Sequence, residues 1–216
     1  MTLEDKSVIL FYGDSITDAE REKDSGLDLG KGFVRLLGSY LGYKNQNKFF
    51  KIINRGVGGD SIYELVKRLE YDCLAFPVDV LSILVGVNDS TFRLWVKDAP
   101  APIAPEEFER CYRRILDAVK KKNPKIQLVL CTPYMVEKTA EHRINKELLR
   151  HYVPIIHRLA EEYQAILVPY FEEMEKRINE GTADGLTNDG VHPTEAGAFF
   201  LAEIWAENVV GEHICG

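Results

Sequence analysis

Long apolar runs and dense basic clusters are both missing from this sequence. No stretch of its 216 residues approaches the roughly 20 apolar residues that span a bilayer. The apolar run at 8–12 follows charged residues at 4–6 and is too short for the core of a signal peptide. The one dense basic run, at 120–122, is typical of a solvated helix end. With a net charge of −7, we expect a cytoplasmic protein that binds neither membranes nor nucleic acid.

Cysteines are few, and their spacing does not favour a cross-linked or metal-bound scaffold. The four are Cys73, Cys111, Cys131 and Cys215, with no C-x-x-C pair among them. A chain of this length can bury a large core without disulfides. Cys73 and Cys111 fall on apolar helix positions and Cys131 ends an apolar run, so we expect these three to be reduced core residues.

Short β-rich runs alternate with stretches of helical periodicity along the chain. Several of the runs are almost continuously apolar, which is typical of parallel strands buried on both faces. The alternation predicts a three-layer α/β/α sandwich with a mainly parallel five-stranded sheet, built as a single domain over residues 1–216. The predicted strands are Val8–Tyr12, Phe50–Asn54, Val80–Val85, Gln127–Cys131 and Ala165–Val168.

The helices are predicted from apolar residues that lie three and four positions apart. Such spacings recur in the segments 33–41, 62–69, 108–119 and 144–163. Pro154 lies inside the last segment and is expected to kink or divide that helix. A final helix begins near Pro193, with Thr194 as its N-cap.

Four short segments carry side chains that together suit acyl transfer. They are Gly13-Asp14-Ser15, Asn54 to Gly59, Gly86-Val87-Asn88-Asp89, and Asp189 to Pro193. The first three end or directly follow the first three predicted strands, and ligands of open α/β sheets bind beyond the carboxyl ends of the strands. Each segment alone is equally typical of an ordinary turn, because Gly, Asn, Asp and Ser are turn residues. All four together favour an active site.

Ser15 is the candidate nucleophile and His192 its candidate base. A serine hydroxyl needs a neighbouring base to attack at neutral pH. His192 is the one histidine of five that lies among turn residues, whereas His142, like two others, falls in a helical segment as a surface or boundary residue. Asp189, three residues before His192, is placed to fix the imidazole tautomer, although an aspartate there is also typical of a turn.

Acyl transfer also needs hydrogen-bond donors for the oxyanion that develops on the carbonyl oxygen. The candidates are the backbone N–H groups of Ser15 and Gly59 and the side-chain amide of Asn88. Glycine suits this role because it lets the backbone approach a substrate without an intervening Cβ. A plain glycine turn, and an asparagine that bonds its own backbone, are the alternative interpretations.

The four segments resemble the motif blocks of the SGNH hydrolases, the GDSL-type esterases and lipases. In this resemblance Ser15 matches the nucleophile, Gly59 the glycine of the second block, Asn88 the asparagine of the third, and His192 with Asp189 the last block. The leading motif reads Gly-Asp-Ser-Ile instead of Gly-Asp-Ser-Leu, which is a conservative departure. The resemblance implies a flavodoxin-like SGNH fold and ester hydrolysis by a Ser-His-Asp triad. It implies no metal and no organic cofactor.

Within that family, Gly-Asp-Ser-Ile-Thr-Asp followed by Gly-Val-Asn-Asp is similar to intracellular carbohydrate acetyl esterases. This similarity implies a small-molecule ester substrate, an O-acetyl group on a carbohydrate. The alternatives are a lysophospholipase or thioesterase of the same fold, a metal-dependent phosphatase using Asp14 and Asp18, and a non-catalytic binding module. Phe92, Trp95 and Tyr134 fit either a sugar-stacking platform or the core and interface of a homo-oligomer.

Overall fold

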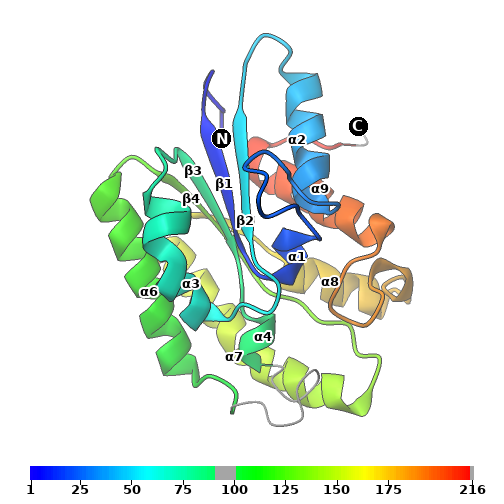
Figure 1. Ribbon diagram of the computed structural model, residues 1–216. Coiled ribbons are helices and arrows are strands. Elements are labelled where there is room, and N and C mark those ends of the chain that lie inside the picture. Colours follow the sequence, from blue (N-terminus) through cyan, green and yellow to red (C-terminus); the bar gives the residue numbers. More distant parts are fainter. Residues whose placement is uncertain (91–100, 215–216) are drawn as a thin grey trace.

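A five-stranded parallel sheet forms the centre of the computed structural model, which describes residues 1–90 and 101–214 (Figure 1). The strands are β1 (Val8–Gly13), β2 (Lys51–Gly56), β3 (Val80–Leu84), β4 (Gln127–Cys131) and β5 (Ile166–Val168). Their order is β2-β1-β3-β4-β5, and every neighbouring pair is parallel. The predicted α/β fold is confirmed, and each predicted strand ends within two residues of the observed one.

The position of β1 in the sheet determines where the site lies. The chain runs from β1 to β2 on one side, and then returns to β3 on the other side. This reversal is the switch point at which open parallel sheets bind ligands, beyond the carboxyl ends of their strands. Every residue of β1 and β3 is buried, which explains their almost continuously apolar sequences.

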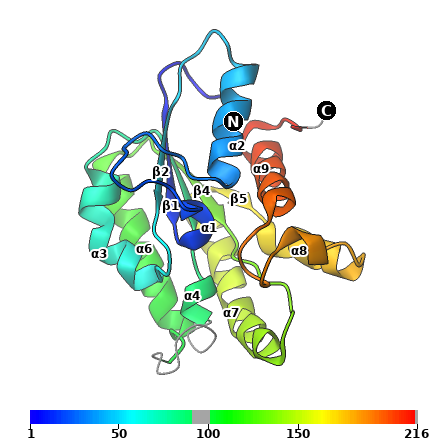
Figure 2. The ribbon, with the colours of Figure 1, turned by 45° about the vertical axis from the view of Figure 1, so that its right-hand side comes forward.

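Helices cover both faces of the sheet. Helices α2 (Phe33–Lys44) and α9 (Glu195–Val210) lie on one side, and α3 (Ile62–Leu69), α6 (Pro105–Lys122) and α7 (Ala140–Glu162) lie on the other (Figures 1 and 2). The short helices α1 (Ser15–Asp18) and α4 (Val87–Ser90) follow β1 and β3 directly. Helix α8 (Tyr170–Asn179), which the sequence analysis did not predict, follows β5.

Helix α9 is fixed to the sheet through a fully buried indole. The ring of Trp205 packs on Phe11 of β1 with centroids 5.4 Å apart, and its Nε1–H donates to Ser82 Oγ of β3 at 3.1 Å. Thr194 caps the helix by accepting the Gly197 N–H at 3.1 Å, as predicted. Because His192 lies two residues before this cap, the packing of α9 also places the candidate base.

Three predictions about individual side chains have clear outcomes. Cys73, Cys111 and Cys131 are buried and unpaired, as expected for reduced core residues. Pro154 does not divide its helix, because α7 continues through it and buries the neighbouring Tyr152 and other side chains along its inner face. The third prediction is the surface or boundary position of His142.

The surface or boundary position expected for His142 is wrong. The residue is 4% exposed, and its Nδ1 accepts backbone N–H groups of Lys138 and Thr139 at 3.0 and 3.1 Å. It is the third helical residue of α7 and the partner of Thr139 in the capping box, so its side chain turns toward the helix start instead of solvent.

Within 1–90 and 101–214, no helix is long and apolar enough to cross a bilayer.

Candidate active site

The nucleophile candidate is placed by the end of β1. The strand ends at Gly13, Asp14 acts as the N-cap of α1, and Ser15 is the first residue of that helix. Asp14 Oδ1 accepts the Ile16 N–H at 3.0 Å, which fixes the turn on either side of Ser15. Asp14 is 1% exposed, and this burial raises the pKa of its carboxyl to about 7.

Ser15, His192 and Asp189 form a continuous hydrogen-bonded chain. Ser15 Oγ lies 2.9 Å from His192 Nε2, and His192 Nδ1 lies 2.6 Å from Asp189 Oδ2. The second oxygen of Asp189 accepts the backbone N–H groups of Val191 and His192, at 3.0 and 2.8 Å. With Nδ1–H donating to the carboxylate, Nε2 is the acceptor for the serine proton, which is the arrangement of a general base.

The carboxyl of Asp189 is held in its ionised form. Partial burial alone would raise its pKa, but hydrogen bonds from the His192 ring and from the backbone N–H groups of His192 and Val191 hold it below the ordinary value. An ionised Asp189 stabilises the imidazolium that forms when His192 takes a proton.

The loop that carries the acid and base is anchored on both sides. Asn188 N–H donates to His192 O at 2.9 Å, and Val136 N–H donates to Gly190 O at 2.8 Å. Lys138 Nζ donates to the carbonyl of Thr187 at 2.6 Å. The first bond closes the loop on itself, and the other two tie residues 187–192 to the segment that follows β4.

A glycine turn lies against the nucleophile. A Cβ placed on Gly58 would lie 3.9 Å from Ser15 Cβ, whereas a Cβ on Gly59 would meet no atom within 4 Å. Gly59 has φ +85°, a conformation that favours glycine, and its N–H has no acceptor among the described residues. The Gly59 N–H is thus available to a ligand, one residue after the glycine that lies beside Ser15.

Asn88 reaches the same turn from the end of β3. Its Nδ2 donates to Asp60 O at 2.9 Å, which uses one of its two amide hydrogens and leaves the other for a ligand. The adjacent Asp89 is fully buried, and its Oδ1 accepts the Ile62 N–H at the start of α3 at 3.0 Å. Burial raises the pKa of Asp89 to about 7.

A cavity of about 910 Å³ opens beside Ser15 and His192. Its lining is mixed: Ile16, Ala19 and Pro193 are among its apolar residues. Its charged residues are Asp18, Glu20, Glu195 and Lys31, whose Nζ pairs with Glu20 at 2.7 Å. Neutral polar residues, Asn188 and Thr194 among them, complete the wall. A neutral, hydroxyl-rich leaving group suits this lining better than one that carries phosphate.

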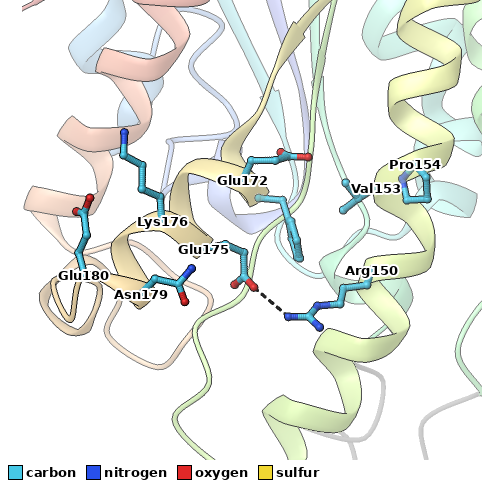
Figure 3. Close-up of a pocket in the computed structure, with 9 residues that line it drawn as sticks. Arg150, Val153, Pro154, Glu172, Glu175, Lys176, Asn179 and Glu180 are labelled. Carbon is cyan, nitrogen blue, oxygen red and sulfur yellow. Dashed lines mark hydrogen bonds and ion pairs between the residues drawn. The ribbon is translucent and has the colours of Figure 1, made fainter.

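Figure 3 shows a different cavity, of about 630 Å³, between α7 and α8. It does not include Ser15, Asp189 or His192, and its charged side chains already have partners, several of them outside the lining. Arg150 Nη2 lies 3.0 Å from Glu175 Oε2, and the buried Lys146 pairs with the other oxygen of the same carboxylate. We therefore assign this cavity no part in the chemistry.

Every site residue predicted from the sequence lies at one edge of the sheet, with the hydrogen bonds given above. Tyr134, by contrast, is fully buried in the core and cannot stack on a sugar. Phe92 and Trp95 lie outside the described residues. Asp18, predicted only as part of the phosphatase alternative, accepts the Gly58 N–H, a bond between segments 40 residues apart that no local pattern indicates.

The predicted absence of a metal stays a prediction. Within 1–90 and 101–214, no group of three or more His, Cys, Asp and Glu side chains is arranged to hold an ion.

Comparison with known proteins gives the same fold and the same chemistry. Residues 11–198 match the sequence profile of the GDSL-like Lipase/Acylhydrolase family. The chain belongs to this family. A crystal structure from Parabacteroides merdae described as a GDSL-like lipase is 34% identical, with a TM-score of 0.88, covering 98% of this chain and 99% of that one. This GDSL-family member is a carboxylic ester hydrolase.

Two acetylxylan esterases are also similar to this GDSL-family chain. That of Geobacillus stearothermophilus is 26% identical over 93% of each chain. Its crystal structure superposes with a TM-score of 0.82 at 24% identity, covering 99% of this chain and 98% of that one. That of Xylanibacter ruminicola is 27% identical over 94% of this chain, which spans only 43% of that longer protein.

Proposed function

We propose that the chain is a serine esterase that removes acetyl groups from carbohydrates through an acyl-enzyme on Ser15. The observation that carries the proposal is the chain of hydrogen bonds from Ser15 Oγ to His192 and on to Asp189, 2.9 and 2.6 Å long, at the wall of a cleft. The similarity to two acetylxylan esterases supports an acetyl ester of a carbohydrate as the substrate.

In the proposed reaction, Ser15 Oγ attacks the ester carbonyl while His192 Nε2 takes its proton. The carbonyl oxygen becomes an oxyanion that accepts hydrogen bonds from the N–H groups of Ser15 and Gly59 and from the Asn88 amide. His192 then returns the proton to the leaving alcohol, and the acetyl group stays on Ser15. A water molecule, deprotonated by His192, attacks the acyl-enzyme, and acetate leaves as Ser15 regains its proton.

The charge of the cleft disfavours the other acyl hydrolases of this fold. Lysophospholipids and acyl-coenzyme A thioesters carry phosphate groups, but the one cation among the described lining residues, Lys31, already pairs with Glu20. The neutral hydroxyl groups of an oligosaccharide need no cation and can exchange hydrogen bonds with the polar residues of the wall. The cleft lining therefore supports the carbohydrate ester over these substrates.

An ester panel tests the proposal. Wild-type protein and Ser15→Ala would be assayed on acetylated xylo-oligosaccharides, p-nitrophenyl acetate and decanoate, a lysophospholipid and acetyl-coenzyme A. We expect the highest kcat/KM on the acetylated oligosaccharide and no turnover by Ser15→Ala, with its melting temperature unchanged. Faster turnover of the lysophospholipid or thioester would contradict the substrate, and normal turnover by Ser15→Ala would contradict the mechanism.

A phosphatase and a binding module are separated from the esterase by two further measurements. Activity that survives EDTA and is lost after treatment with a serine-directed fluorophosphonate is expected of a metal-free serine esterase. A burst of p-nitrophenol equal to one acyl group per chain would exclude a non-catalytic module.

Three further expectations stay part of the proposal. The single domain over 1–216 predicts one cooperative unfolding transition. The cytoplasmic location is tested by cell fractionation, and a homo-oligomer by light scattering on the purified protein.

A further inference from the structure

The glycine turn at the site is a four-residue unit with a defined geometry. Asp60 N–H donates to Val57 O at 3.2 Å, and Gly59 at the third position has φ +85°. These features describe a type II turn, in which the third residue needs positive φ. The direction of the Gly59 N–H is therefore set by whatever holds the turn in place.

Besides the bond that Arg68 Nε donates to the Asp60 side chain at 2.6 Å, three hydrogen bonds hold the backbone of the turn from outside. Val57 N–H donates to Gly13 O at 3.0 Å, Asn88 Nδ2 donates to Asp60 O at 2.9 Å, and Gly58 N–H donates to Asp18 Oδ2 at 3.0 Å. Only the last of these three is made by a central residue of the turn, Gly58, which directly precedes Gly59. The Asp18 carboxylate is thus bonded one peptide unit away from the Gly59 N–H, the candidate oxyanion donor.

Asp18 is itself held rigidly relative to Ser15. The two residues are the ends of α1, and Gly56 packs so closely on this helix that a Cβ there would lie 2.1 Å from the Asp18 N. Asp18 is 7% exposed, and the cations of Arg21 and Lys23 lie 3.8 and 3.7 Å from its oxygens. The carboxylate is therefore charge-balanced, and its one hydrogen bond within the described residues goes to Gly58.

We propose that Asp18 is a positioning residue for the oxyanion hole, holding the Gly58 N–H so that the Gly59 N–H points at the oxygen of the substrate carbonyl above Ser15. The inference rests on the proposed acyl-enzyme chemistry of Ser15. It gives one four-residue helix two tasks, because α1 presents the nucleophile at its first residue and aligns the oxyanion donor from its last.

A second aspartate in the following loop provides a matched comparison. Asp28 accepts the backbone N–H groups of Glu22 and Gly30, at 2.7 and 3.4 Å, and pairs with Arg35. It stabilises the loop between α1 and α2 without contacting the Gly58 turn. A carboxylate needed only for loop stability would act as Asp28 does, whereas Asp18 bonds across to the turn that follows β2.

The test compares Asp18→Ala, Asp18→Asn and Asp28→Ala with wild type. We expect Asp18→Ala to lower kcat on p-nitrophenyl acetate about 10- to 100-fold with little change in KM, because a donor moved by about 1 Å stabilises the transition state less. Asp18→Asn keeps an acceptor oxygen for Gly58 and should stay within about threefold of wild type, a margin well below the loss of a full donor. Asp28→Ala should keep wild-type kcat.

Two readouts separate positioning from general damage. End-point labelling with a fluorophosphonate counts competent sites, so kcat is calculated per labelled serine. The low-field proton resonance of the His192–Asp189 hydrogen bond should be unchanged in Asp18→Ala, because the triad does not depend on the turn.

Three outcomes would overturn the inference: a kcat for Asp18→Ala within twofold of wild type, an Asp18→Asn variant as slow as Asp18→Ala, or an equal loss in Asp28→Ala. The failure of the proposed function is a separate result, because it would appear as the absence of ester turnover, or of serine labelling, in the wild-type protein itself.

Discussion

Replacing Asn88 by alanine should lower turnover far more than stability. One amide hydrogen of Asn88 is used at Asp60 O, 2.9 Å away, and the other is left for the oxyanion. Loss of one oxyanion donor costs about 10²–10³-fold in kcat, or about 3–4 kcal/mol of transition-state stabilisation. Loss of the bond to Asp60 costs about 1 kcal/mol of folding stability. The two effects differ enough in size to be measured separately.

The kinetic effect would be measured as kcat and KM on p-nitrophenyl acetate, and the stability effect by urea unfolding followed by tryptophan fluorescence. Asn123→Ala is the matched control, because Asn123 Nδ2 also donates to a backbone carbonyl, that of Val78 at 3.0 Å, away from the site. It should lose similar stability and keep its kcat. If Asn88→Ala lost stability but kept kcat within threefold of wild type, Asn88 would be a structural residue only.

Three other predictions follow from the same geometry. Asp189→Asn should lower kcat on the order of 10⁴-fold in the ester assay, as in other triads where the tautomer is lost, and a loss under tenfold would contradict its role. Asp89, with a pKa raised to about 7 from 3.8, holds a proton that the unfolded chain releases, so its stabilisation is present below about pH 4 and is lost as pH rises through 7. Urea unfolding at pH 5 and pH 8 should therefore show a smaller pH difference in Asp89→Asn than in wild type, and an equal difference would refute the assignment. Gly56→Ala should destabilise the fold by about 3 kcal/mol or more in the same assay, since its Cβ would lie 2.1 Å from Asp18 N. Gly42→Ala, whose Cβ meets nothing within 4 Å, should not destabilise it.

Local patterns were sufficient wherever one physical factor dominates. The strands β1 and β3 are buried on both faces, so almost continuously apolar runs identify them without knowledge of their neighbours. Thr194 was recognisable as a cap because capping depends on residues within one turn. Residue type and place at a strand end were likewise enough to select Ser15 and Asn88, and His192 was selected by its position among turn residues, three after Asp189.

Patterns failed where tertiary packing outweighs local preference. Pro154 breaks one backbone hydrogen bond, yet α7 continues because its inner face is buried against the sheet. His142 lies in a polar helical segment, but its ring turns inward to cap the helix start. Helix α8 carries only two buried residues, Tyr170 and Met174, so its sequence shows too weak an apolar stripe to predict.

The sequence by itself determined the chemistry of this protein, because the residue types needed for acyl transfer fall at the ends of three predicted strands and in the turn before the last predicted helix. Only the tertiary structure decided how those groups act together. The 2.9 Å approach of Ser15 to His192 joins residues 177 positions apart, and the bond from Asp18 to Gly58 joins two different strand ends. Such distances depend on the parallel order of the sheet and on the packing of α9, which no local pattern encodes.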